Sequence, residues 1–118
     1  MDFSDDTVNY LESKGTLEIL SQIGSEGECR HFDLRHTVIV SSSTITNRLN
    51  KGVKLGLLDH TIVHIDGDRT EKGYKLTEKG HQIYGIIQNT GLPQKYKERK
   101  ELEENINHSE HKVLQIIN

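Results

Sequence analysis

The apolar residues of this chain recur mainly at the spacing of an α-helix. Apolar positions three or four residues apart form one face of a helix, and that face packs on a core. This pattern predicts six helical segments, at residues 7–11, 16–23, 34–38, 44–55, 77–88 and 94–117. Residues 60–65 and 72–76 are predicted to form a β-hairpin, because they flank the turn sequence Asp66-Gly67-Asp68. Residues 29–32 are predicted to form one further short strand.

Small polar residues and glycines mark the expected ends of the helices. Ser, Thr and Asp are favoured N-caps because their side chains accept a hydrogen bond from a free helix N–H. Candidates precede four of the segments: Ser4 or Asp5, Asp33, Ser41 to Ser43, and Thr77. Gly24 and Gly56 follow apolar runs and are expected to end two helices. The expected buried stripes are Ile45, Leu49 and Val53 in segment 44–55, and Ile83, Ile86 and Ile87 with His81 or Gln82 in segment 77–88.

The order of these elements predicts the fold. Two helices joined by Ile39 and Val40 and followed by a two-stranded hairpin form a helix-turn-helix with a wing. We therefore predict a mainly α protein with a small β-hairpin, of the α+β class. A winged helix-turn-helix DNA-binding domain is expected at residues 1–90, and an added C-terminal helix at residues 91–118.

The C-terminal helix is expected to support dimerisation. It follows a break at Pro93 and is mostly polar, so it is not expected to be stable alone. Four apolar residues and one serine form a narrow seam along it, namely Leu102, Ile106, Ser109, Val113 and Ile116. Pairing with a second copy of the chain is the simplest way to cover such a seam. We therefore expect a homodimer.

Five stretches resemble a known group of regulators. Residues 41–49 (SSSTITNRL) and 53–58 (VKLGLL) resemble the recognition helix of MarR-, PadR- and HxlR-type transcriptional regulators. Residues 74–80 (YKLTEKG) are similar to their second wing strand and following helix start. Residues 16–20 and 32–34 correspond to the first helix and the start of the second helix in HxlR-type proteins. The resemblance covers residues 15–88 and implies a regulator that binds double-stranded DNA, but the N-terminal cysteine motif of many HxlR-type proteins is absent.

The polar face of segment 44–55 carries the candidate base-reading residues. At about 100° per residue, this face lies opposite the apolar stripe. Asparagine suits adenine, arginine suits guanine, and serine or threonine suits either base. Ser41 is expected to cap the helix. The predicted DNA-binding residues before and within the helix are Arg35, His36, Ser42, Ser43, Thr44, Thr46, Asn47, Arg48, Asn50, Lys51 and Lys54.

The predicted wing carries basic and acidic residues together. Arg69 and Lys72 are the candidate DNA contacts, because a basic wing residue can enter the minor groove. Asp66, Asp68 and Glu71 lie beside them and repel phosphate. A solvated turn without a DNA contact is the equally plausible alternative for this segment.

The charge distribution allows DNA binding although the chain is acidic overall. The net charge is −3, whereas DNA-binding proteins are usually basic. Residues 1–29 hold seven acidic residues and one lysine, but residues 30–60 hold five basic residues and two acidic ones. Local positive charge is sufficient to attract a phosphate backbone. The acidic total leaves one alternative open, a winged-helix protein-interaction module without specific DNA readout.

Other classes of protein are disfavoured. No apolar run approaches the length of about 20 residues that a membrane span needs, and the acidic N-terminus is unlike a signal peptide. A single cysteine forms no internal disulfide, which suits the reducing cytoplasm. No nucleophile–base pair or glycine-rich phosphate-binding motif stands out. We expect a cytoplasmic protein with no enzyme activity, cofactor or membrane partner.

Two further sites have competing interpretations. Cys29 near His31 is a candidate redox-sensing thiol, because an imidazolium lowers a thiol pKa. Its alternative role is that of a small buried hydrophobe. Glu104, His108 and His111 have the spacing of metal ligands on one helix face. That face lies opposite the apolar seam and lacks further ligands, so no metal site is expected.

Overall fold

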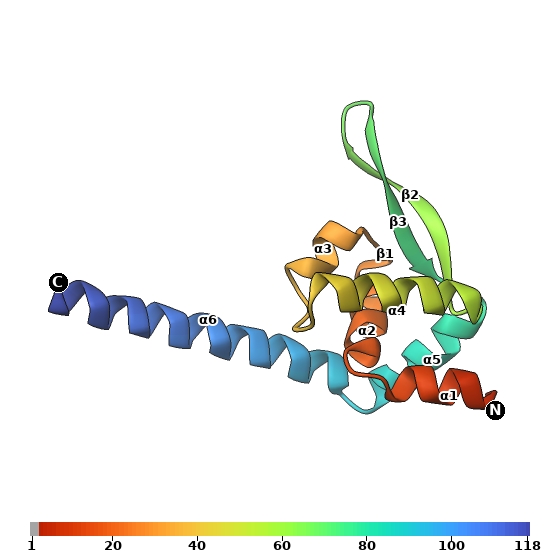
Figure 1. The fold of residues 1–118 in the computed structure, drawn as a ribbon, viewed down its shortest axis with the longest axis horizontal. Coiled ribbons are helices and arrows are strands. Elements are labelled where there is room, and N and C mark those ends of the chain that lie inside the picture. Colours follow the sequence, from red (N-terminus) through yellow and green to blue (C-terminus); the bar gives the residue numbers. More distant parts are fainter. Residues whose placement is uncertain (1–2) are drawn as a thin grey trace.

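Six helices and three strands follow one another in residues 3–118, which the computed structural model describes (Figure 1). The first two residues of the predicted 1–90 domain lie outside the described residues. The elements are α1 (Asp5–Glu12), α2 (Thr16–Glu26), β1 (Glu28–Cys29), α3 (His31–Arg35), α4 (Ser42–Lys54), β2 (Leu58–Asp66), β3 (Arg69–Leu76), α5 (Glu78–Asn89) and α6 (Leu92–Ile117). This order confirms the predicted mainly α, α+β fold with a helix-turn-helix and a wing.

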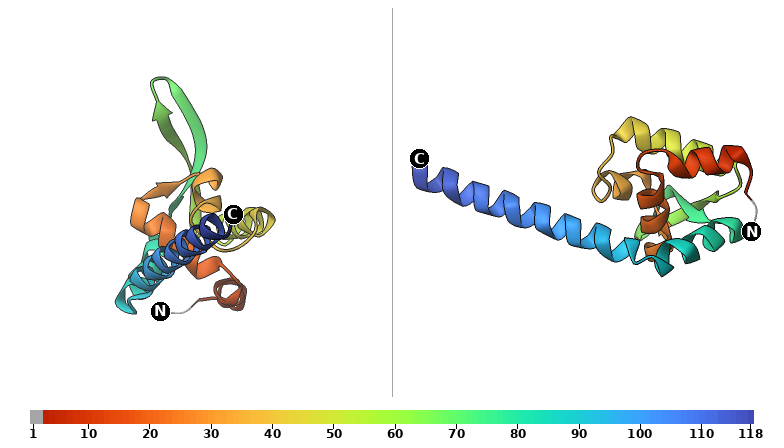
Figure 2. Two further views of the ribbon diagram at one scale, coloured as in Figure 1. Left: turned by 90° about the vertical axis from the view of Figure 1, so that its left-hand side faces the viewer. Right: turned by 90° about the horizontal axis from the view of Figure 1, so that it is seen from below.

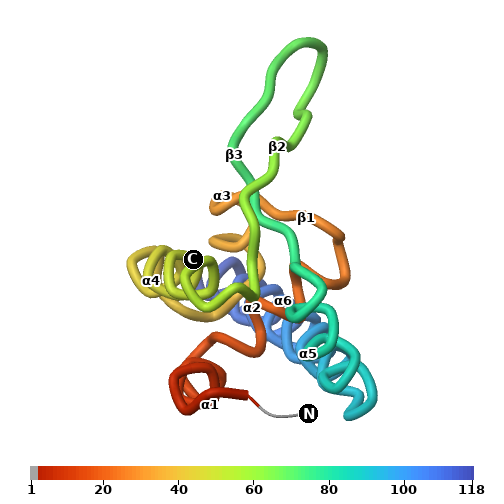
Figure 3. The backbone as a smooth tube through the Cα atoms, turned by 90° about the vertical axis from the view of Figure 1, so that its right-hand side faces the viewer, coloured from red at the N-terminus to blue at the C-terminus, as the bar shows by residue number. Residues whose placement is uncertain are grey.

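The strands form one antiparallel sheet in the order β1-β3-β2. Cys29 of β1 and His60 of β2 both pair with Tyr74 of β3, so all three strands meet at the base of the hairpin. The outer part of the β2–β3 hairpin projects away from the helices (Figure 3). This projecting hairpin, residues 58–76, is called the wing below.

Helix α2 lies at the centre of the core. Ile19, Leu20 and Ile23 on α2 have no exposed surface. Apolar residues of every other element except α6 pack into the same buried cluster, which includes Tyr10, Cys29, Leu34, Ile45, Leu49, Leu57, Leu58, Tyr74, Leu76, Ile83 and Ile87. Full burial of one such aliphatic side chain contributes about 1.5–3 kcal/mol. The core therefore fixes α4 and the base of the wing relative to each other.

Two residues expected to end or cap a helix do not do so, and the helix expected at residues 34–38 is found at His31–Arg35. Gly24 does not end α2, which continues to Glu26 and ends at Gly27, where φ is +88°. A Cβ atom on Gly24 would overlap the Tyr84 ring of α5, so this glycine serves close helix packing. Asp33 does not precede its helix either. It lies inside α3, where its carboxylate accepts a hydrogen bond from the backbone N–H of Arg30 at 2.9 Å.

Two other local expectations are partly wrong. The predicted strand at 29–32 is shorter and begins earlier, because residues 31 and 32 already belong to α3. On α5, Ile83 and Ile87 are buried as expected, but Ile86 is 50% exposed and His81 and Gln82 are exposed. Gly80, one turn before Ile83, is buried too. The buried stripe of α5 therefore follows steps of three and four residues and excludes Ile86.

Helix α6 extends far beyond the rest of the fold (Figures 1 and 2). Its 26 residues correspond to a length of about 39 Å. Leu92, Pro93, Tyr96 and Arg99 are half-buried against the body, and every residue from 100 to 118 is exposed. The seam residues expected to mediate dimerisation are therefore uncovered in the single chain. Among residues 3–118, no helix is long and apolar enough to cross a membrane.

Candidate DNA-binding interface

Helix α4 begins two residues earlier than expected and is capped by Ser41. The Ser41 hydroxyl accepts a hydrogen bond from the backbone N–H of Thr44 at 3.3 Å, which is the capping role expected for it. Ser42 and Ser43 therefore lie in the first turn, where backbone N–H groups lack helical acceptors. Such a helix start can bind a phosphate.

The outer face of α4 is polar and contains no acidic residue. Ile45 and Leu49 are buried and Val53 is half-buried, as the helical spacing predicted. Of the predicted DNA-binding residues on this helix, Thr44 and Arg48 are half-buried and the rest are exposed, namely Ser42, Ser43, Thr46, Asn47, Asn50, Lys51 and Lys54. The structure thus brings the predicted residues together on one accessible surface. Its charged groups are all cationic.

Contacts from α1 hold the middle of α4. The buried Tyr10 side chain donates a hydrogen bond from its hydroxyl to the Arg48 carbonyl oxygen at 2.6 Å. Burial raises the pKa of this phenol above its usual range. Gly52 permits the close approach, because a Cβ there would lie 2.6 Å from the Tyr10 oxygen. Neither Tyr10 nor Gly52 stands out in the sequence as a support of the recognition helix.

Arg48 makes contacts inside the protein that periodicity did not reveal. Its Nε donates to the backbone oxygen of Lys14 at 3.1 Å, and its Nη1 donates to Oδ1 of Asn47 at 2.8 Å. The guanidinium therefore connects the turn between α1 and α2 to the amide of Asn47. This arrangement restricts the Asn47 side chain, which lies near the centre of the exposed face.

Helix α3 supplies both a support and an exposed basic cluster. His31 Nε2 lies 3.0 Å from the Thr46 hydroxyl and 3.2 Å from the Ser42 carbonyl oxygen, so it connects α3 to the start of α4. The predicted backbone contacts Arg35 and His36 are both exposed. They flank the Phe32 ring, with the His36 ring centroid at 4.5 Å and the Arg35 guanidinium carbon at 5.4 Å.

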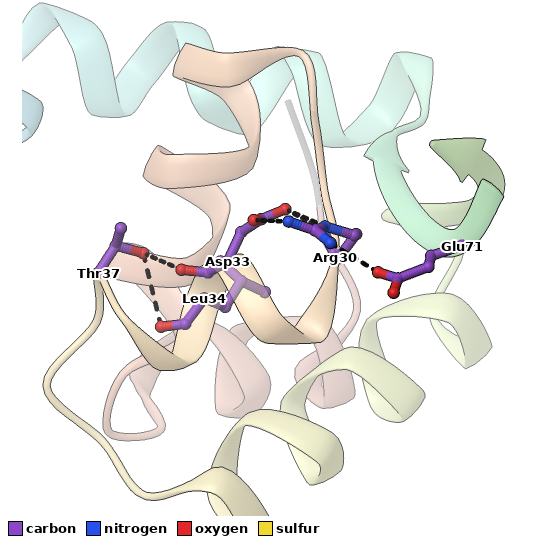
Figure 4. A network of polar contacts seen from close by, with 5 residues as sticks. All are labelled: Arg30, Asp33, Leu34, Thr37 and Glu71. Carbon is purple, nitrogen blue, oxygen red and sulfur yellow. Dashed lines mark hydrogen bonds and ion pairs between the residues drawn. The ribbon is translucent and has the colours of Figure 1, made fainter. Parts of the chain in front are cut away.

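A charged network connects α3 to the wing (Figure 4). Arg30 donates from Nη1 to Glu71 at 2.6 Å and from Nη2 to Asp33 at 2.8 Å. Hydrogen bonds from Arg30 hold the pKa of Asp33 below its usual value. Glu71 is therefore paired within the protein and is not simply a free charge that repels phosphate. The sequence showed Arg30 only as one of several basic residues.

The two residues predicted to contact DNA from the wing are both exposed, but they lie at different distances from the body along the hairpin. Arg69 is the first residue of β3 and pairs with Asp66 across the tip of the wing. Lys72 lies nearer the body, opposite Ile62, and its Nζ is 5.7 Å from the Tyr74 ring centroid. The acidic residues Asp66 and Asp68 remain beside Arg69. Of the ion pairs within residues 3–118, only that between Arg30 and Glu71 compensates an acidic side chain of this segment.

The surroundings of Cys29 favour a packing role over redox sensing. Its side chain is 1% exposed. The pKa of its thiol rises to about 12, first because burial disfavours the thiolate and second because of nearby carboxylates, chiefly Asp33. His31 is engaged with the start of α4. These features are those of a small buried hydrophobe.

We expect Cys29 to react slowly with iodoacetamide in the native protein. Near pH 8, the raised pKa leaves far less thiolate than in an ordinary cysteine, and thiolate is the reacting species. Alkylation near pH 8, followed by mass spectrometry, should be at least about a hundredfold slower than in the urea-unfolded chain. The unfolded chain is the control for the intrinsic rate. Equal rates in both states would support the redox interpretation instead.

The C-terminal histidines remain in an exposed region. Glu104, His108 and His111 are all exposed on α6. Within residues 3–118, no three His, Cys, Asp or Glu side chains gather in a way that could hold a metal ion. The structure therefore adds no ligand to the spacing seen in the sequence.

Comparisons with known proteins agree with this geometry. A family model described as HxlR-like helix-turn-helix matches residues 10–101. No curated protein matches the sequence significantly. Among solved structures, the reduced form of the transcriptional regulator YodB from B. subtilis aligns with a TM-score of 0.60 and 16% identity, over 78% of this chain and 90% of that one. Diamide-treated YodB gives a TM-score of 0.57 at 16% identity, over 75% and 85% of the two chains.

A third solved structure has the same fold over a longer stretch. It is a protein from Enterococcus faecalis V583 that is assigned to the MarR family of transcriptional regulators, with a TM-score of 0.58 and 17% identity. The alignment covers 87% of this chain and 96% of that one. At these identities the three structures establish a shared fold, and the family model extends that likeness to the sequence.

Proposed function

Because the chain belongs to the HxlR-like helix-turn-helix family, we propose that it is a cytoplasmic transcriptional regulator that binds a specific double-stranded DNA sequence as a homodimer. In each half-site, α4 occupies the major groove and the wing lies near the minor groove. The observation that carries this proposal is the outer face of α4, which is polar, largely exposed and free of acidic residues, and which hydrogen bonds of Tyr10 and Arg48 hold to the body.

The residues of α4 divide into two roles. Asn47 lies near the centre of the exposed face, where its amide can reach a base edge. Ser42 and Ser43 offer hydroxyls and backbone N–H groups to a phosphate at the helix start. Lys51 and Lys54 lie in the last turn and suit the phosphate backbone. Thr44, Thr46, Arg48 and Asn50 complete the proposed contact surface of this helix.

Residues outside α4 extend the surface along the DNA backbone. Arg35 lies exposed at the end of α3 and His36 directly after it, and Arg69 and Lys72 lie exposed on the wing. The ion pair between Arg30 and Glu71 supports this arrangement, because it holds the wing to the helix-turn-helix. A supported wing presents its basic residues at a constant angle to α4.

The proposed dimer rests on α6. Leu102, Ile106 and Val113 are 60%, 48% and 53% exposed along one side of a helix that extends beyond the body. Exposure of these apolar side chains to water is unfavourable in a single chain. Pairing with a second copy of α6 would bury them. A homodimer also suits a two-fold symmetric DNA site.

The alternative function is a winged-helix protein-interaction module that does not read DNA. The net charge of −3 and the acidic residues Asp66 and Asp68 at the wing tip favour it, because both repel phosphate. A gel-shift assay with random duplex DNA at low salt separates the two functions. Binding that weakens steeply with salt supports the regulator. No binding at any salt concentration supports the interaction module.

We expect Asn47→Ala to reduce sequence discrimination selectively. The preferred site is first enriched from a pool of random duplexes with the wild-type protein. Removing the hydrogen bonds between one amide and its base should cost about 1–3 kcal/mol on that site and relax the preference at one position of each half-site. Lys54→Ala and Arg69→Ala should weaken binding to specific and random duplexes alike, and each should lower the salt slope by about 1 for every phosphate that is no longer neutralised.

A matched control for this experiment is Asn89→Ala, because Asn89 is also exposed on a helix but lies at the end of α5. This variant should bind like the wild type. If Asn47→Ala also binds both duplexes like the wild type, the outer face of α4 does not contact the bases, and the interaction module becomes the better explanation.

A further inference from the structure

The buried carboxylate of Glu18 joins the helix-turn-helix to α6. Glu18 is 6% exposed and lies in the first turn of the core helix α2. One of its oxygens, Oε2, forms an ion pair with Nη2 of Arg99 on α6. The other, Oε1, accepts a long hydrogen bond of 3.4 Å from the backbone N–H of Ile39. Because Ile39 lies between α3 and α4, one side chain contacts both the turn before the recognition helix and the base of the projecting helix.

Arg99 is the last residue of α6 that is half-buried against the body. Its guanidinium carbon lies 5.4 Å from the Tyr96 ring centroid, and its Nε lies 3.7 Å from the Glu103 carboxylate. Tyr96 is half-buried too, and this burial raises the pKa of its phenol. Beyond Arg99 the helix continues for about 27 Å with every residue exposed. The contacts around Arg99 therefore determine the direction of that free segment.

The ion pair is suited to holding an angle. A carboxylate removed from water needs a charged or hydrogen-bonding partner, so Glu18 resists any rotation of α6 that would withdraw Arg99. The guanidinium is planar and its N–H groups have fixed directions, which makes the contact directional. Among residues 3–118, the pair of Arg99 with Glu18 is the only ion pair that joins α6 to the body.

Small changes of this angle have large effects at the far end of α6. A rotation of about 10° at Arg99 moves the end of the helix by about 5 Å, given a free length of about 27 Å. The rise of one base pair is about 3.4 Å. In a dimer joined through α6, a rotation of this size would therefore change the distance between the two α4 helices by about the length of one or two base pairs.

We propose that Glu18 and Arg99 are positioning residues that select the half-site spacing accepted by the dimer. This inference rests on the proposed function, because it assumes a homodimer that is joined through α6 and binds a two-fold DNA site. Neither residue touches the DNA in this arrangement. They act by holding the angle between α6 and the helix-turn-helix.

The test compares spacing tolerance in matched variants. Glu18→Gln combined with Arg99→Met removes both charges without leaving a buried charge unpaired. Lys100→Met is the control, because it removes an exposed positive charge from the next position of α6. Arg99→Lys and Arg99→Gln each keep a donor for Glu18 and serve if the double variant does not fold by circular dichroism. The probes are the enriched two-fold site and versions with one or two base pairs inserted or removed at its centre.

The proposal predicts a change in discrimination between spacings. Wild type and Lys100→Met should lose about tenfold or more in affinity for each altered spacing, because the DNA must deform to fit a rigid dimer. The double variant should stay dimeric by light scattering but differ by less than about threefold between neighbouring spacings. If the double variant does not fold, Arg99→Gln should discriminate between spacings less than the wild type does. Arg99→Lys, which keeps the positive charge, should lie between the two.

The results distinguish a failure of the positioning role from a failure of the proposed function. If a folded, dimeric double variant discriminates between spacings as the wild type does, the positioning role of Glu18 and Arg99 is wrong while the proposed function stands. The same holds if Arg99→Gln, used in its place, keeps wild-type discrimination. If the wild type enriches no duplex from the random pool, the proposed function itself fails, and this inference fails with it.

Discussion

A chain that ends after residue 103 should be monomeric and should bind a two-fold DNA site at least about a hundredfold more weakly than the full chain. The truncation removes Ile106, Val113 and Ile116 but keeps Tyr96 and Arg99, so the base of α6 and the partner of Glu18 remain. In a dimer, the second half-site binds at a high effective concentration, and avidity of this kind typically strengthens binding by about 10²–10⁴-fold. Light scattering measures the mass, and fluorescence anisotropy measures the affinity.

Substitutions on the two faces of α6 provide the control. Ile106→Ser with Val113→Ser changes the apolar seam and should reproduce the effect of truncation. His108→Ser with His111→Ser changes the opposite face of the same turns and should leave a dimer. If the truncated chain remains dimeric, α6 is not the interface. The exposed side chain of Val8 would then direct attention to α1.

Gly80→Ala should destabilise the protein by about 3 kcal/mol or more, at the upper end of the range for overpacking a core. A Cβ at this position would overlap the backbone carbonyl oxygen of Leu57. That carbonyl cannot withdraw easily, because it accepts a hydrogen bond from the Thr77 N–H at 3.1 Å and Leu57 is fully buried. Since small domains are stable by only about 5–15 kcal/mol, this loss is large. Urea unfolding followed by circular dichroism measures it.

Gly85→Ala on the same helix is the matched control. Apart from its chain neighbours and the nearby backbone of α5 itself, no atom of residues 3–118 lies within 4 Å of a Cβ built there. Replacing glycine with alanine in a helix interior is favourable by about 1 kcal/mol, so this variant should be neutral or slightly more stable. Equal unfolding midpoints for the two variants would show that the junction of α4, the wing and α5 can relax, contrary to the close packing of Gly80 on Leu57.

Local chemistry was a good guide to the helices that carry the site. The steps of four residues between Ile45, Leu49 and Val53 predicted which face of α4 is buried, and the polar face follows from the same geometry. Ser41 and Thr77 cap α4 and α5 as expected, because capping needs only a side chain and the N–H groups of the following turn. The hairpin was also predictable, because the turn residues around Gly67 are adjacent in sequence.

The errors occurred where a specific contact or the packing of the core overrode the preference of the residue type. Gly24 has the usual preference for ending a helix, but in the fold it gives space to Tyr84, 60 positions away in the sequence. Asp33 is a good N-cap by type, yet its carboxylate binds Arg30 from inside the helix. Ile86 fits the apolar stripe of α5, but the burial of Gly80 shows that the stripe is turned away from it.

The sequence by itself determined the order of the elements, the inward face of α4 and the polar side chains on its outward face, because each depends on residues within a few positions of one another. Only the tertiary structure decided what supports that face. The contacts of Arg48 with Lys14, Arg30 with Glu71 and Glu18 with Arg99 join residues 34, 41 and 81 positions apart. Such pairs leave no periodic pattern in the sequence, because they form only after the core has packed and brought their helices and strands together.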